Sequence, residues 1–270
     1  MPPGPVSCST RSKASSTAFA GGLVVERSGG LHPARFHAGL VRRAEAAGAG
    51  LHPGHAAVGV RSDGRAVEVV GGRTIRCGDV LFAVNAHADR AAGGLQAKVL
   101  PMGSFIIATD PLSSELQDAV LPTGRMVYDT RNLLSYWRLD PDGRMVFGGR
   151  KRLGRTTPQQ ARDALHERLA AVHPQLAREP VRWSWGGEVA LTADRLPHCG
   201  RLEGAWYATG CNGSGVALNT WMGTRMAGAI CGDELPPFAE LEHPDVPLHR
   251  YRGAWLPVVS AAFRLQDRLG

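Results

Sequence analysis

Apolar residues recur at helical spacing in two stretches of the chain. After Pro33, one face of a helix is formed by Phe36, Leu40, Val41, Ala44 and Ala47, with Gly48 as a stop signal. The run Thr157-Pro158-Gln159-Gln160 has the pattern of a capping box, and the helical spacing continues to Val172. We therefore predict helices beginning at Pro33 and Pro158, the second ending near His173.

Other stretches have the patterns of strands. Residues 56–61, 66–70 and 73–77 are separated by the turn dipeptides Asp63-Gly64 and Gly71-Gly72, which predicts three consecutive strands. Residues 80–84 (VLFAV) form a continuous apolar run, which is typical of a strand covered on both faces in a layered α/β domain. This run ends at Asn85 and Ala86, at the carboxyl edge where such folds place ligands.

The middle of the chain has longer strand patterns, at residues 98–109, 125–129, 132–139, 144–149 and 181–189. Along 132–139, Tyr136 and Trp137 must face opposite sides of a sheet, so one of the two packs in a core. The pattern predicts a mixed α/β fold: a layered domain (21–95 and 191–235), interrupted by an antiparallel-sheet domain (96–190), and a tail or helix at 236–270. We expect the ligand between the two parts.

The stretch GCNGSG at 210–215 follows a predicted strand at 205–209 and precedes a predicted helix at 215–231. A glycine turn that leads into a helix N-terminus brings free backbone N–H groups and the positive end of the helix dipole close to an anionic group. The spacing is G-x-x-G-x-G, which differs from the dinucleotide-binding G-x-G-x-x-G. A tight structural turn is the alternative interpretation.

Composition narrows the classes of function. The net charge of +7 comes from Lys and Arg residues scattered along the chain, which favours a solvated surface over a nucleic-acid site. The five cysteines have neither disulfide-framework nor zinc-site spacing, and no apolar segment is long enough to span a bilayer. We expect a cytoplasmic protein without a metal site. Residues 1–20 are rich in Ser and Pro, which predicts disorder.

Six segments, in their order and spacing, resemble the FAD-dependent amine and amino-acid oxidoreductases of the D-amino-acid oxidase family, gamma-glutamylputrescine oxidoreductase type. They are GGLVVERSGGLHPARF, VLFAVNAH, IIATDPL, YWRL with FGGR, WGGEVALTADRLPHCGR and GCNGSGVALNTWMG, and the resemblance covers residues 21–270.

The resemblance implies FAD as cofactor and oxidation of a substrate C–N bond by hydride transfer. The flavin end of FAD is expected at the glycine turn and the helix that follows. The anionic group at the helix N-terminus would then be the negatively charged reduced flavin ring and not a phosphate. The cofactor-binding residues implied are Val58 near the adenine, Asn85 and Ala86 at the strand end, and Gly210, Cys211, Asn212, Gly213, Ser214, Gly215 and Val216 in the turn.

The resemblance also implies substrate contacts, at Tyr136, Arg138 and Trp185 in the inserted sheet and at His32. Each has an ordinary alternative: core packing for an aromatic residue, a surface position for Arg138, and a helix cap for His32. Cys211 suits a small space-filling role better than thiol chemistry. No general acid–base pair stands out, and hydride transfer to a flavin does not demand one, so the catalytic residues stay unassigned.

The sequence departs from the family in one respect. It contains neither G-x-G-x-x-G nor an acidic residue about 20 positions further on. We therefore expect an incomplete FAD-binding domain, a truncated gene product, weakened FAD binding and an exposed sheet edge. The alternative function is a non-catalytic remnant that acts through protein contacts, with a dimer or partner covering that edge.

Overall fold

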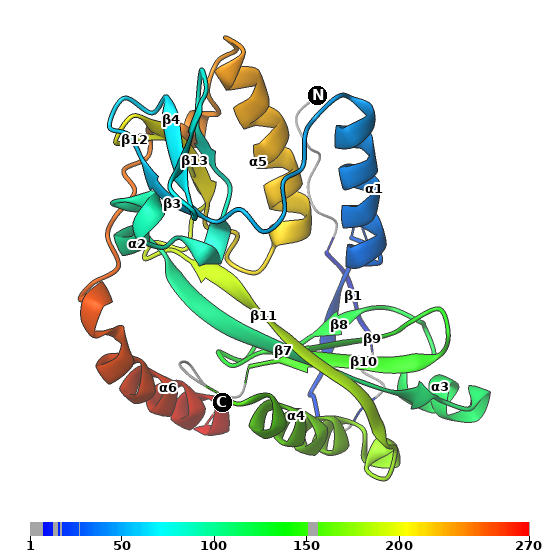
Figure 1. The fold of residues 1–270 in the computed structure, drawn as a ribbon. Helices are drawn as coiled ribbons and strands as arrows, with labels where there is room; N and C mark the ends of the chain where they lie inside the picture. The colour runs from blue at the N-terminus through cyan, green and yellow to red at the C-terminus, as the bar shows by residue number, and fades with distance from the viewer. Residues whose placement is uncertain (1–7, 13–15, 17, 27, 151–155, 270) are drawn as a thin grey trace. The chain divides into compact units, whose positions relative to one another are not determined.

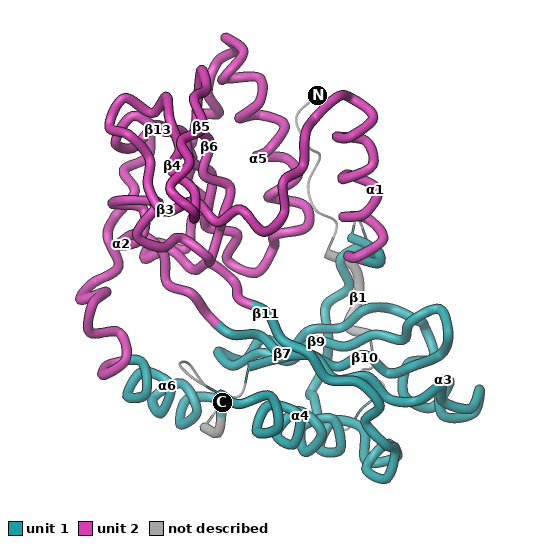
Figure 2. The backbone as a smooth tube through the Cα atoms, viewed as in Figure 1, with its two compact units in different colours: residues 1–32, 103–187, 256–270 teal, residues 33–102, 188–255 magenta. Residues whose placement is uncertain are grey.

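The computed structural model describes residues 8–12, 16, 18–26, 28–150 and 156–269 (Figure 1). Its backbone divides into two compact units (Figure 2): unit 1 comprises residues 1–32, 103–187 and 256–270, and unit 2 comprises residues 33–102 and 188–255. The insertion thus begins seven residues later than the sequence predicts and ends three residues earlier. The segment 236–255 lies in unit 2, whereas the C-terminal helix lies in unit 1.

Unit 1 is built on a five-stranded sheet with the order β11-β7-β10-β9-β8. The strands are β7 (Leu100–Pro111), β8 (Val127–Tyr128), β9 (Ser135–Leu139), β10 (Arg144–Gly149) and β11 (Val181–Leu191). Its helices are α3 (Ser114–Val120), α4 (Pro158–Val172), η3 (Pro174–Leu176) and α6 (Arg252–Leu269), with α6 starting in unit 2. The antiparallel pairing of β10 with β7 and β9 confirms the predicted antiparallel sheet.

The core of unit 1 lies between one face of this sheet and α4. Trp137, Phe147 and Ile107 extend from β9, β10 and β7 and are almost fully buried. Helix α4 packs its apolar stripe, Ala161, Leu165, Leu169 and Val172, into the same core. Thr157 and Gln160 form the predicted capping box, with both hydrogen bonds 3.2 Å long.

The N-terminal region contains a strand that the sequence does not reveal. Strand β1 (Cys8–Ser12) pairs antiparallel with β2 (Gly22–Val25). Strand β1 lies within residues 1–20, for which the composition predicts disorder. The two strands are joined by backbone hydrogen bonds, which any sequence can form, so a Ser- and Pro-rich composition does not indicate them. Residues 1–7, 13–15 and 17, to which the same prediction applied, lie outside the described residues.

Unit 2 contains two three-stranded sheets. One has the order β12-β13-β6, from β6 (Leu81–Phe82), β12 (His198–Leu202) and β13 (Ala205–Thr209); the other has the order β3-β4-β5, from β3 (Ala57–Val60), β4 (Ala66–Val69) and β5 (Arg73–Arg76). The helices are α1 (Pro33–Ala46), η1 (Asn85–His87), η2 (Arg90–Ala92), α2 (Leu95–Lys98), α5 (Gly215–Ile230), η4 (Pro237–Glu240) and η5 (His249–Tyr251).

Strand β13 runs parallel to β6 and antiparallel to β12, so unit 2 adds a parallel strand pair to the mixed α/β fold. Helix α5 contacts β13 and buries Met222, Met226 and Ala229. The parallel register pairs Trp206 with Leu81. Strand β13 therefore directs the chain into the glycine turn at its carboxyl end.

The prediction that residues 80–84 are covered on both faces is wrong. Only Leu81 and Phe82 form the strand, and 37% of Leu81 and 38% of Val84 is exposed. Strand β6 is the last strand of its sheet within the described residues, so no strand pairs with its outer edge. The apolar composition of this run favours burial, but composition alone does not show which elements would cover the run.

His173, at the carboxyl end of α4, makes unit 1 sensitive to acid. Only 1% of the residue is exposed, its ring lies edge-on to Trp137, and burial lowers its pKa from 6.5 to about 4. The folded chain therefore favours the neutral ring. The stability that comes from burying this neutral ring is fully present above pH 6.5 and is lost as the pH falls towards 4. We expect acidification over this range to cost about 2–3 kcal/mol of unfolding free energy.

The variant His173→Phe keeps the aromatic contact and removes the proton-binding site, so it flattens this pH dependence. Urea unfolding of the variant and the unmodified chain at pH 7 and pH 4.5 measures the difference. His37→Gln, at an exposed position of α1, is the matched control. Equal pH dependence of His173→Phe and the unmodified chain contradicts the assignment.

Candidate functional site

The glycine turn connects β13 to α5 through residues with left-handed backbone conformations. Gly210 has φ +81° and Gly213 has φ +101°. A Cβ atom at Gly210 would lie 2.7 Å from the Thr192 side chain, so the close approach there requires glycine. A Cβ atom at Gly213 would meet no atom within 4 Å, which leaves the backbone open on that side.

Asn212 fixes the turn to the segment that follows β11. Its amide N–H donates to Ala190 O at 3.0 Å, and its side-chain Oδ1 accepts from Thr192 N at 3.1 Å. Its Nδ2 group donates to Leu196 O at 3.2 Å and to Gly210 O at 2.8 Å. Asn212 has φ +46°, a conformation that asparagine tolerates better than most residues. Its amide is thus already bonded within the protein, and its role is to hold the turn.

The N-terminus of α5 carries backbone N–H groups that its own cap does not use. The side chain of Ser214, the N-cap residue, makes no capping hydrogen bond, and the first helical bond runs from Leu218 N to Ser214 O at 3.1 Å. The N–H groups of Gly215, Val216 and Ala217 therefore have no acceptor within the helix. Val216 is 44% exposed, so this positive helix end is accessible.

The end of β6 lies against the turn. Asn85, with φ +48°, donates from Nδ2 to Cys211 Sγ at 3.2 Å, while its Oδ1 is buried and has no partner within the described residues. Ala86 is buried against Val99 and Ala190. Cys211 is 5% exposed and fills space beneath the turn. The structure thus brings together Asn85, Ala86 and the turn, from segments more than 120 residues apart.

Val58 lies apart from this cluster, in the second sheet of unit 2. It belongs to β3 and is 53% exposed. No hydrogen bond in the described part of the chain joins it to the turn.

In unit 1, Tyr136 and Arg138 lie on the sheet face opposite the core, while Trp137 between them is buried. One of the two aromatic neighbours thus packs in the core, as the alternation predicts. Gly148 pairs with Tyr136 and makes room for the tyrosine ring, because a Cβ there would lie 2.3 Å from it. The Tyr136 hydroxyl lies 3.2 Å from Ser104 Oγ.

Trp185 of β11 lies on the same open face. The neighbouring Gly186 faces the ring of Phe105, which packs against the core, so alternation directs Trp185 away from the core. Trp185 is 46% exposed, and β7 and β10 separate β11 from the strand of Tyr136. His32 lies outside the sheet, in the exposed segment before α1.

A second cluster in unit 2 joins residues to which the sequence pattern assigns no functional role. His198 Nε2 lies 3.0 Å from the Asp194 carboxylate, and its ring stacks on His243 with centroids 4.0 Å apart. The ring of Tyr207 also stacks on His243. Burial, aided by the charges of His198 and Lys98, lowers the pKa of His243 to about 4. Only the three-dimensional packing of His243 against His198 of β12 and Tyr207 of β13 reveals this cluster.

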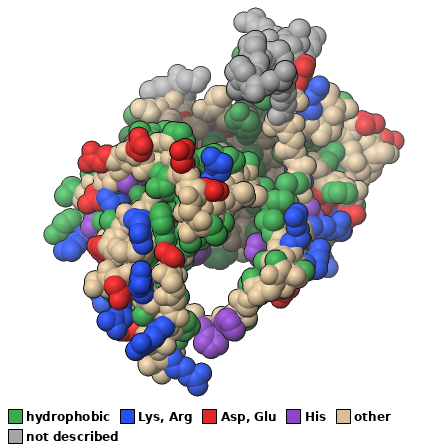
Figure 3. Space-filling model, turned by 90° about the horizontal axis from the view of Figure 1, so that it is seen from above, with side chains coloured by type: hydrophobic (Ala, Val, Ile, Leu, Met, Phe, Trp, Pro, Cys, Tyr) green, Lys and Arg blue, Asp and Glu red, His purple; other side chains and the backbone are tan. Residues whose placement is uncertain are grey.

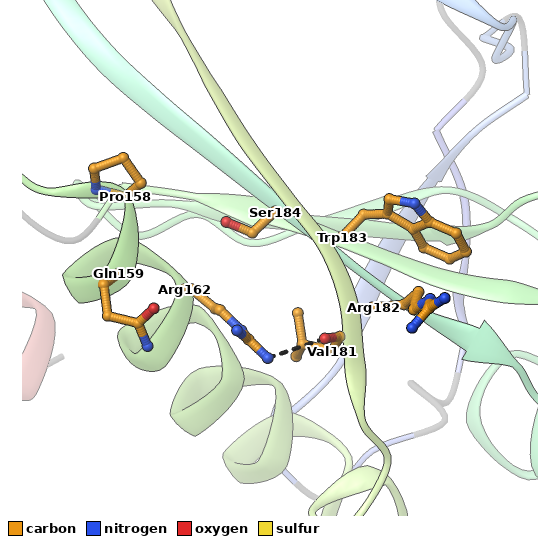
Figure 4. A pocket seen from close by; sticks show the side chains of 7 residues that line it. All are labelled: Pro158, Gln159, Arg162, Val181, Arg182, Trp183 and Ser184. Atoms are coloured by element: carbon orange, nitrogen blue, oxygen red, sulfur yellow. Dashed lines mark hydrogen bonds between the residues drawn. The ribbon is translucent and has the colours of Figure 1, made fainter.

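Other features bear on the class of function. A cavity of about 250 Å³ at the start of β11 is lined by none of the predicted site residues (Figure 4). On the face shown in Figure 3, basic side chains are interspersed with acidic and uncharged ones. Among the described residues, no helix has the length and hydropathy to cross a membrane, and no group of His, Cys, Asp or Glu side chains has the arrangement of a metal site.

Comparison with known proteins identifies oxidoreductases as the relatives of this chain. The sequence model of the DAO family, "FAD dependent oxidoreductase", matches residues 6–229. The chain is 33% identical to the probable oxidoreductase OrdL of Haemophilus influenzae over 84% of its length and 54% of that protein's. It is 28% identical to the gamma-glutamylputrescine oxidoreductase of Escherichia coli, over 96% of its length and 62% of that protein's.

Solved structures share the fold. Glycine oxidase from Geobacillus kaustophilus superposes with a TM-score of 0.65 at 23% identity, covering 77% of this chain and 56% of the oxidase. Iminodiacetate oxidase from Chelativorans gives a TM-score of 0.62 at 22% identity, over 80% of this chain and 57% of that one. The chain therefore spans a little over half the length of the proteins it matches.

The side-chain bonds of Asn212 can be separated from its backbone conformation by two substitutions. Asn212→Gly keeps the left-handed conformation and removes the hydrogen bonds to Thr192, Leu196 and Gly210, so we expect a loss of about 1–3 kcal/mol. Asn212→Ala adds about 1 kcal/mol of backbone strain. Urea unfolding measures both, and equal stability of Asn212→Ala and the unmodified chain contradicts the assigned role.

Proposed function

Because this chain belongs to the family of FAD-dependent oxidoreductases, we propose that unit 2 holds the flavin end of FAD and that the chain serves the oxidation of a C–N bond in an amine or amino acid. The cofactor of this family is FAD. The observation that carries the proposal is the uncapped N-terminus of α5, with the N–H groups of Gly215, Val216 and Ala217 next to an open glycine turn.

The residues present fit the flavin end of the cofactor. A flavin ring offers N–H donors and carbonyl acceptors along its pyrimidine edge. The buried Oδ1 of Asn85, which has no hydrogen-bond partner among the described residues, supplies an acceptor, and the first turn of α5 supplies donors. At Gly213 the absence of a side chain leaves room for a ring to approach. The sequence contains no G-x-G-x-x-G for the pyrophosphate, so the fit is limited to the flavin end.

These groups act by position and charge. When bound, FAD would supply the acceptor for the hydride and two electrons that an amine loses as its C–N bond becomes the C=N bond of an imine. The positive end of α5 would stabilise negative charge on the pyrimidine edge of the flavin, and the hydrogen bonds of Asn212 would hold the turn in place.

The open face of the five-stranded sheet is the proposed substrate surface. Tyr136 and Trp185 supply aromatic faces, and Arg138 supplies a cation for a carboxylate. The E. coli relative is named for gamma-glutamylputrescine, whose glutamyl group carries an α-carboxylate. We therefore propose a substrate that combines an amine with a carboxylate. His32 and Val58 remain proposed contacts, to substrate and adenine, on the family resemblance alone.

The helix donors can be tested with a single substitution. Val216→Pro removes one N–H group in the first helical turn, where proline is tolerated, whereas Val216→Ala retains it. Since the donors favour the reduced, anionic flavin, we expect Val216→Pro to lower the two-electron reduction potential of the bound flavin by about 30 mV, a tenfold change in equilibrium. Spectroelectrochemical titration of the flavin-loaded chain measures this. Identical potentials for Pro and Ala at this position contradict the proposal.

The carboxylate contact predicts a selective loss of binding. Arg138→Gln removes the cation but keeps a long polar side chain, so we expect ligands with a carboxylate to bind at least tenfold more weakly. An amine of the same length without a carboxylate is expected to bind equally well to both chains. Calorimetric titration of the two ligands compares them. An equal loss for both ligands contradicts a carboxylate contact.

The exposed outer edge of β6 favours a second candidate, a role through protein contacts. Leu81 and Val84 offer an apolar strip that a partner or a second chain could cover. Flavin titration distinguishes the two roles, since a chain that binds no flavin supports the second.

We also propose a cytoplasmic location, which is supported by the free thiols of Cys77, Cys199, Cys211 and Cys231.

A further inference from the structure

Strand β11 leaves a long edge of the five-stranded sheet without a partner. It is the terminal strand of the order β11-β7-β10-β9-β8, and within the described residues no strand pairs with its outer edge. Every residue from 182 to 188 is exposed, including Trp183 at 44% and Trp185 at 46%. Unpaired edges of this length expose backbone donors and acceptors that readily pair with another chain.

The segment lacks the usual protection of an edge strand. Residues 181–191 (VRWSWGGEVAL) contain no proline and no lysine, and the two charged residues, Arg182 and Glu188, have opposite signs. Arg162 of α4 donates to Val181 O at 3.0 Å (Figure 4), and the Arg144 guanidinium lies 4.4 Å from the Trp183 ring, but no strand pairs with the outer backbone edge of β11 within the described residues. In the same view, Trp183 points away from Gln159 and Arg162.

The sequence of this edge is complementary to itself. When two copies pair antiparallel about a twofold axis at Trp185, Arg182 of each copy lies opposite Glu188 of the other. Trp183 then lies opposite Gly187, and Ser184 opposite Gly186. Among registers that keep the two sheets facing the same way, no other places the arginine opposite the glutamate. Opposite charges and an aromatic residue across from glycine are favourable cross-strand pairs.

The charges needed for this pairing are accessible. Half of the Glu188 side chain is exposed, and its recorded partner is the exposed His87, 3.8 Å away. The Arg182 guanidinium lies 5.8 Å from the Trp183 ring and forms no ion pair within the described residues. A second copy can thus pair with both groups at little cost in existing contacts.

From these observations we propose that β11 is a homodimer interface, in which two chains join their five-stranded sheets by antiparallel pairing of residues 182–188. The interface is isologous, so each Arg182–Glu188 contact occurs twice. Backbone hydrogen bonds supply affinity and the charges set the register. This proposal is independent of flavin binding.

Charge reversal tests the register. Sedimentation equilibrium of the full chain is expected to show a mass twice the 28.8 kDa of one chain. Arg182→Glu and Glu188→Arg each place like charges opposite each other twice, so we expect the dimer dissociation constant to rise at least about tenfold in each. The double variant Arg182→Glu/Glu188→Arg restores opposite charges, and we expect it to restore the dimer.

The control is Arg178→Glu, which reverses an exposed charge just before the strand and leaves the dimer intact. Circular dichroism establishes that each variant is folded. A monomeric unmodified chain, a dimer that persists in both single variants, or a double variant as weak as the singles would each overturn the proposal.

Discussion

The hydrogen bonds of Asn212 are the constraint on which the candidate site depends. Through its backbone and its side chain, this residue binds Ala190, Thr192, Leu196 and Gly210. These bonds fix the carboxyl end of β11 to the turn after β13. The direction in which α5 leaves the turn follows from them, and so does the position of its unbonded N–H groups.

The same cluster shows how unit 2 assembles a site from distant segments. Asn85 reaches Cys211 from the end of β6, and Ala86 packs on Ala190. Residues 85, 190 and 211 lie within three residues of the carboxyl ends of β6, β11 and β13, so the candidate site lies near strand ends, where α/β folds place their ligands. Asn85 Oδ1 is buried without a hydrogen-bond partner in the described part of the chain, and such burial is costly unless a ligand satisfies the group.

Local sequence signals predicted much of the fold. Pro33 and Gly48, and the capping box of Thr157 and Gln160, mark helix ends through contacts within four residues, and α1 and α4 start at the predicted prolines. The alternation of Tyr136 and Trp137 likewise predicted that the two residues face opposite sides of the sheet, but only the structure shows that Trp137 is the one in the core.

Features set by distant contacts were not predictable. Three of the four partners of Asn212 lie 16 to 22 residues away, and the stacking of His198 on His243 joins residues 45 positions apart. The run 80–84 has the composition of a covered strand, but composition cannot state what covers it, and the structure leaves its outer side exposed. Strand β1 depends on pairing with β2, which a polar sequence does not announce.

We propose above all that the first turn of α5 binds the reduced flavin. Amide NMR of the full chain with selectively labelled glycine, valine and alanine tests it directly, by comparing spectra before and after reduced flavin is added. We expect the amide signals of Gly215, Val216 and Ala217 to shift, while those of Gly71 and Gly72 in a distant turn stay unchanged. Flavin binding that leaves these three amides unshifted, or no binding at all, would contradict it.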